Sequence, residues 1–83
     1  MMQLKEYFAE WDPMGFIKDG APRDEYDAEA REVTLRFKQD MNPEQMAKMI
    51  NEVFVEYMEI EPDSFYEDCL QRAPDILEIL RSK

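Results

Sequence analysis

The chain has 83 residues, of which 20 are Asp or Glu and 10 are Lys or Arg, so its formal charge is -10. Proteins bind nucleic acid by neutralising phosphates with Lys and Arg, and a strongly acidic surface repels both phosphates and anionic membranes. We therefore expect no direct binding to nucleic acid or membrane, whereas attraction to a basic protein surface is allowed.

The cysteine count and the hydropathy pattern indicate a cytoplasmic protein. One cysteine rules out an intrachain disulfide framework, and no apolar run approaches the about 20 residues that a membrane span needs. A charged-then-apolar leader is also lacking. We expect one helical domain over residues 1–83 with a thin core, because folding at this size buries about 60–65% of the unfolded surface.

The first helix is expected over residues 2–11. Its apolar residues follow the i, i+3, i+4, i+7 spacing of one helical face: Leu4, Tyr7, Phe8 and Trp11. The helix must end before Pro13, because a proline pushes the preceding residue out of the helical region. Trp11 is interpreted as a core anchor, since large aromatic side chains dominate the burial available to a small domain.

An elbow of turns follows the first helix. Asp12, Pro13 and Gly15 occupy the positions that these residue types favour in a type I turn, and Asp19-Gly20 indicates a second reversal. The elbow is therefore predicted to be ordered.

The second and third helices are expected over residues 24–39 and 43–59. Asn42, Pro43 and Gln45 match a capping box with proline in the first helical position. The core stripe of the second helix is Tyr26, Ala30, Val33 and Phe37, and that of the third is Met46, Ile50, Val53, Phe54 and Tyr57.

The fourth helix is expected over residues 64–81, and it contains Pro74. Its apolar stripe runs through the proline: Phe65, Cys69, Ala73, Ile76 and Leu80. An interior proline usually kinks a helix and disfavours it by about 3 kcal/mol. We expect one helix bent near Pro74, with two shorter helices as the alternative.

No segment has a convincing strand pattern, so the predicted fold is all-α. Connections of about 3–12 residues make consecutive helices neighbours. The expected architecture is a small irregular or orthogonal bundle of about four helices.

The elbow also carries a family resemblance. Trp11-Asp12-Pro13-Met14-Gly15, followed by Asp24-Glu25-Tyr26-Asp27, resembles the YugE-like family of short bacterial proteins, a domain-of-unknown-function family with an all-helical fold. Similar Trp-Asp-Pro and Asp-Glu-Tyr elements occur in some small proteins thought to act as toxin immunity factors. The resemblance implies binding to another protein, and it transfers no catalytic residue.

Two pairs of glutamates define an enzymatic alternative. Glu29/Glu32 and Glu56/Glu59 lie on separate predicted helices, and such pairs hold Mg²⁺ in MazG-like nucleotide pyrophosphohydrolases. That class normally has Asp at the last position. Glu32 and Glu59 are also expected to point away from the core stripes, so the four need not converge, and solvated faces are the favoured interpretation.

The remaining polar and thiol groups have local explanations. Asp24, Glu25 and Asp27 suit a helix start, and they could also meet a basic partner. Cys69 lies on the core stripe and no His is present to activate it, so we expect a small buried hydrophobe. The sequence thus predicts no catalytic residue, no metal site and no cofactor.

Apolar residues off the core stripes provide the better functional signal. Leu35 and Val55 lie about 180° from their stripes, and Met49 and Met58 lie at the margins. Exposed apolar patches mark partner or self-association surfaces, although isolated exposure is common. The leading hypothesis is a non-enzymatic interaction protein, either a homodimer or an inhibitor-like module for a basic partner. Its candidate surface comprises Asp24, Glu25, Asp27, Leu35, Val55 and Met58.

Overall fold

Four helices make up the regular structure of the described chain. The structure is a computed structural model that describes residues 2–61 and 65–82. The helices are α1 (Leu4–Trp11), α2 (Asp27–Arg36), α3 (Pro43–Met58) and α4 (Tyr66–Arg81), and these residues form no strand. The expected all-α fold of about four helices is confirmed.

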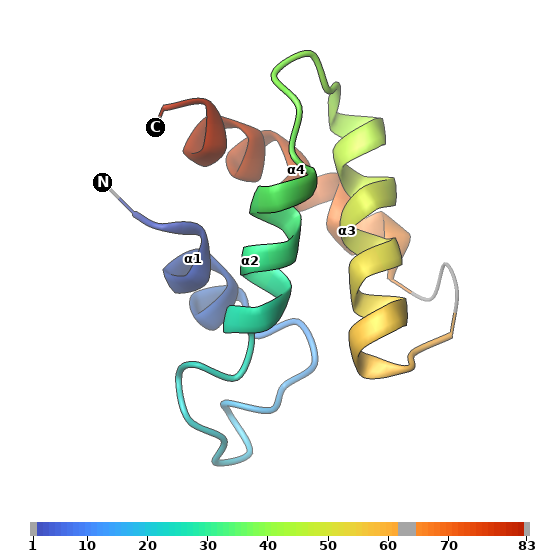
Figure 1. Ribbon diagram of the computed structural model, residues 1–83. Coiled ribbons are helices and arrows are strands. Elements are labelled where there is room, and N and C mark those ends of the chain that lie inside the picture. The colour runs from blue at the N-terminus through green and yellow to red at the C-terminus, as the bar shows by residue number, and fades with distance from the viewer. Residues whose placement is uncertain (1, 62–64, 83) are drawn as a thin grey trace.

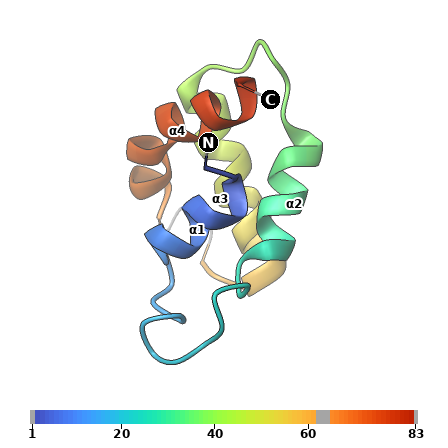
Figure 2. The same cartoon turned by 90° about the vertical axis from the view of Figure 1, so that its left-hand side faces the viewer.

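In Figure 1, α2 and α3 run roughly side by side, whereas α4 crosses them at a steep angle, so the four helices do not align as in a regular bundle. α3 packs against α2 and α4, and α1 packs against the same two helices. Figure 2 shows α1 beside α2, with the elbow extending beyond the end of both helices. The irregular bundle follows from this elbow, which separates α1 from α2 in the sequence without separating them in space.

The bounds of α2 differ from the sequence prediction of 24–39. Before α2, isolated turns close between Pro22 and Glu25 and between Asp24 and Asp27. After α2, Phe37 adopts an extended backbone with ψ 138° and packs against the core. The helix is therefore shorter than predicted and spans Asp27–Arg36, with local turns before it and an extended residue packed on the core after it.

The other bounds agree closely with the prediction. α1 ends at Trp11, directly before the turn that contains Pro13. The capping box is present: the Gln45 amide donates to the Asn42 side chain at 2.8 Å, and the Asn42 amide donates to the Gln45 side chain at 3.0 Å. The predicted start of the fourth helix at residue 64 lies outside the described residues.

α4 continues through Pro74 as one helix. The alternative of two shorter helices is therefore wrong. The axis of α4 changes direction between its first and second halves (Figure 2), as expected of a helix that loses one backbone hydrogen bond to an interior proline.

One hydrophobic core joins all four helices. Phe8, Tyr26 and Phe54 are fully buried, and the rings of Phe54 and Phe65 meet edge to face at 5.2 Å between centroids. Trp11 is half-buried and packs against Phe8, Phe54 and Phe65, which confirms its role as a core residue. Each fully buried aromatic side chain stabilises the fold by about 1.5–3 kcal/mol.

A cluster of hydrogen bonds around the side chains of Asp12 and Tyr26 orders the elbow, and we call this cluster the polar knot. The Asp12 carboxylate accepts hydrogen bonds from the amides of Ile17 and Lys18 at 3.1 and 2.9 Å, and from the Tyr26 hydroxyl at 2.5 Å. The Gly15 amide donates to the Asp12 carbonyl at 3.0 Å, which closes the predicted turn. The elbow is therefore held by Asp12 and the buried Tyr26.

Candidate functional site

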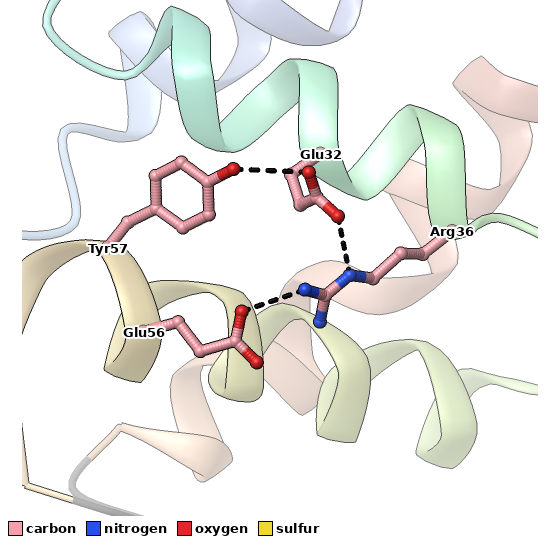
Figure 3. Close-up of polar contacts among 4 residues, drawn as sticks. All are labelled: Glu32, Arg36, Glu56 and Tyr57. Carbon is pink, nitrogen blue, oxygen red and sulfur yellow. Dashed lines mark hydrogen bonds and ion pairs between the residues drawn. The ribbon is translucent and has the colours of Figure 1, made fainter.

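A polar network joins α2 to α3 at two of the four predicted glutamates (Figure 3). The Arg36 guanidinium donates from Nε to Glu32 at 2.7 Å and from Nη2 to Glu56 at 2.7 Å. The Tyr57 hydroxyl donates to the other oxygen of Glu32 at 3.1 Å. The structure thus brings Glu32 and Glu56 together, with Arg36 between them.

The charges in this network stabilise one another. The Arg36 guanidinium, with help from the Tyr57 hydroxyl, holds the pKa of Glu32 below its usual range. The hydrogen bonds to Glu56 and Glu32 raise the pKa of Arg36. The hydrogen bond that the Tyr57 hydroxyl donates to Glu32 raises the pKa of Tyr57, and the negative charge of Glu32 adds to this shift because the phenol would have to ionise beside it. An internal cation therefore already pairs with both carboxylates and offsets one of their two negative charges.

Glu29 forms no hydrogen bond with this network and is buried, with 5% of its surface exposed. Its Oε1 atom has no hydrogen-bond partner among the described residues. Burial raises the pKa of Glu29, and the nearby charges of Glu25 and Asp27 add to the shift. The interpretation of Glu29 as a solvated side chain is wrong, because α2 contacts both α1 and α3 and so buries a wider face than its stripe predicted.

The predicted glutamates do not form a metal site with this geometry. Glu59 is exposed and terminates α3 in a left-handed conformation with φ 54°. Within residues 2–61 and 65–82, no three side chains of His, Cys, Asp or Glu lie close enough to hold a metal ion. The position between Glu32 and Glu56 that a cation would need is taken by Arg36.

The residues of the predicted partner surface are distributed over several environments. Asp24 and Glu25 are exposed in the turns before α2, and Asp27 is half-buried as its first residue. Leu35 is 73% exposed on α2. On α3, Val55 is half-buried and Met58 packs against the core.

Leu35 borders a groove between α1 and α2. One hollow of about 280 Å³ is lined by Gln3, Leu4, Lys5, Asp27, Ala30, Arg31, Thr34 and Leu35. A second hollow of about 210 Å³ is lined by Lys5, Glu6, Ala9, Arg23, Asp24 and Asp27. Lys5 and Asp27 line both hollows. The two hollows are therefore treated as one surface, which we call the α1–α2 groove.

Besides Arg23, the groove includes two more cations that the sequence analysis did not select, Lys5 and Arg31. Neither side chain forms an ion pair with any residue that the structure describes. Arg31 and Leu35 are spaced i, i+4, so they share one side of α2, and this spacing was a signal available in the sequence. Lys5 could not be added without knowing that α1 packs beside α2.

Two further features concern the cysteine and the membrane. Cys69 is fully buried in α4, and burial raises the pKa of its thiol to about 12, which agrees with its prediction as a small hydrophobe. Among the described helices, none has the length and apolar character needed to cross a bilayer.

Comparison with known proteins gives a family for the chain. The family model described as Domain of unknown function (DUF1871) matches residues 3–83. The chain belongs to this family. The match confirms the expected membership in a domain family of unknown function, whereas the narrower YugE-like label stays a prediction. Searches against curated proteins and against solved structures find no match.

Proposed function

We propose that this member of the DUF1871 family is a non-enzymatic protein-interaction module that binds through the α1–α2 groove. The observation that carries the proposal is the 73% exposure of Leu35 beside a hollow lined by the apolar side chains of Leu4 and Ala30. Burying a leucine side chain is favourable by about 1.5–3 kcal/mol. A partner that covers Leu35 would recover free energy that the isolated fold leaves unused.

The acidic residues of the groove, which stand among an equal number of cations, support the same proposal. Asp24 and Asp27 line the groove, and Glu25 is exposed next to them. Charged groups around an apolar centre steer the encounter and select the partner, while the apolar centre supplies affinity. Self-association and inhibitor-like or immunity-like binding of a basic protein are the two forms of the proposal. The YugE-like resemblance and the single cysteine favour such a role in the cytoplasm.

The metal-dependent hydrolase is not proposed. Its four glutamates would need to share a divalent cation through oxygen ligands. Two of them bind the Arg36 guanidinium, and Glu29 is buried without a partner for its Oε1 atom.

A capture and sedimentation experiment tests the proposal. The tagged full chain and its Leu35→Glu variant are compared by sedimentation over a range of concentrations and by affinity capture from native lysate. Lys48→Asp, at an exposed position of α3, is the control. We expect association or specific capture by the wild type and the control, and its loss in Leu35→Glu. A wild type that stays monomeric and retains the same proteins as Leu35→Glu contradicts the proposal.

A further inference from the structure

The α1–α2 groove has a different charge balance from the rest of the surface. Its lining includes three cations and three acids, although acids outnumber cations 20 to 10 in the whole chain. These residues are Lys5, Arg23, Arg31, Glu6, Asp24 and Asp27. The groove is therefore the part of an acidic molecule where a second acidic molecule meets the least repulsion.

The charges have an order along the groove. Arg31 and Leu35 lie at one end, Asp24 and Arg23 lie at the other, and Lys5 and Asp27 lie between them because they line both hollows. Arg23 forms one ion pair, with Glu10 at 3.5 Å, and both side chains are more than 60% exposed. Such an exposed ion pair contributes little to stability, so Arg23 is free to contact a bound molecule instead of Glu10.

This order is self-complementary under a two-fold rotation. An axis through the middle of the groove places the end with Arg31 opposite the other end of a second copy, where Glu6 and Asp24 outnumber Arg23 by one charge. The symmetry repeats this contact, so it is made twice. Closed homodimers use such isologous interfaces, in which residue i meets residue j of the partner and j meets i. The exposed Leu35 would then lie against the apolar floor of the facing groove.

We propose that the α1–α2 groove is the isologous interface of a homodimer, in which Arg31 faces the partner's Asp24 and Leu35 is covered. The inference rests on the proposed function and selects a second copy as the partner. A basic protein is attracted to the acidic remainder of the surface but is repelled at Lys5 and Arg31. A second copy carries the same net charge of -10, so its binding needs a contact surface on which opposite charges meet. A second copy offers a groove with balanced charge.

A charge-swap experiment on the full chain tests the pairing. Arg31→Asp places like charges opposite the partner's Asp24, and Asp24→Arg places like charges opposite the partner's Arg31. We expect each single variant to dimerise at least tenfold more weakly than the wild type by sedimentation velocity. An equimolar mixture of the two variants should recover the dimer, because both contacts then join opposite charges. Lys48→Asp on α3 makes the same charge change as Arg31→Asp and should leave dimerisation unchanged.

Three results would overturn the inference. They are a wild type that remains monomeric, single variants that dimerise as well as Lys48→Asp, and a mixture that recovers no dimer although circular dichroism shows both variants folded. The outcome for the proposed function is separate. A monomeric wild type that captures a protein in a Leu35-dependent manner overturns the homodimer and leaves the interaction role in place. A monomer without a groove-dependent partner overturns both.

Discussion

Replacing Tyr26 by Phe removes one hydroxyl from the polar knot of the elbow and leaves the buried ring in place. The hydroxyl donates to Asp12 at 2.5 Å and accepts from the amides of Met14 and Phe16 at 3.2 and 3.4 Å. The ring stacks on Phe16 with 6.3 Å between centroids, and it contacts Phe54 at 6.2 Å. The substitution therefore changes hydrogen bonding with little change in packing.

The expected loss of stability follows from these contacts. A hydrogen bond to a charged acceptor contributes about 1.5–3 kcal/mol. The two amide contacts are long and only partly buried, so water can replace much of what they contribute. We expect Tyr26→Phe to lower the free energy of unfolding by about 2 kcal/mol. For a domain of this size that corresponds to a fall of about 8–16 °C in Tm.

Urea and thermal unfolding monitored by circular dichroism measure this effect. Tyr57→Phe is the matched control, because it removes a hydroxyl that donates to Glu32 at 3.1 Å from an exposed ring. It should have a much smaller effect, since water satisfies an exposed partner. A Tyr26→Phe variant within about 0.5 kcal/mol of the wild type would refute the assignment of the knot as the element that orders the elbow.

The pH dependence of the knot provides a further check on the same variant. The Tyr26 hydroxyl and the amides around it hold the pKa of Asp12 below its usual range, so the stabilisation from Asp12 is present above its unfolded pKa and is lost as pH falls through its folded pKa. Burial and the Asp12 charge raise the pKa of Tyr26 to about 12. Its contribution is therefore complete below about pH 10, the pKa of an unperturbed tyrosine, and is lost as pH rises toward the folded value. The difference between Tyr26→Phe and wild type should stay constant between about pH 6 and 9.

Three other predictions concern buried or paired groups. Glu29→Gln should stabilise the fold by about 1 kcal/mol at pH 7, because it removes a charge from a buried position with an unpartnered oxygen. Because the pKa of Glu29 is raised in the folded state, its charge destabilises the fold only as pH rises from the unfolded pKa through the folded pKa. In urea unfolding, the stability gained by Glu29→Gln should therefore disappear near about pH 4. An unchanged gain at that pH would contradict the assignment. Cys69 should react with a thiol reagent only in denaturant, because its thiol is fully buried with a pKa of about 12; reaction at the rate of a free thiol without denaturant would show that α4 opens. Arg36→Gln should raise the midpoint of the Glu32 titration in NMR, since Arg36 is the main cause of its lowered pKa, and an unshifted midpoint would exclude the ion pair in solution.

Several features of the fold were encoded locally and could be predicted from the sequence. The capping box of α3 depends on residues three positions apart, and the turn after Trp11 depends on Asp12, Pro13 and Gly15. The burial of Cys69 follows from apolar spacing along α4. Each signal lies within about one turn of chain, where propensity and periodicity operate.

The candidate site could be predicted only in part. The sequence placed Leu35 away from the core stripe of α2, and its exposure confirms that placement. It did not identify Lys5 as part of the same groove, because that depends on α1 packing beside α2 across the elbow. Glu29 was misjudged for a related reason, since its burial depends on contacts of α2 with two helices at once.

The sequence by itself determined the presence of the four helices, the capping box of α3, the turn after Trp11 and the excess of acid, because these depend on residue type and on spacing within a few positions. Tertiary structure alone decided that Arg36 would stand between Glu32 and Glu56, and that Lys5 and Arg31 would line one groove. The physical reason is that such convergence depends on how the helices cross, and the crossing is set by the packing of the whole core.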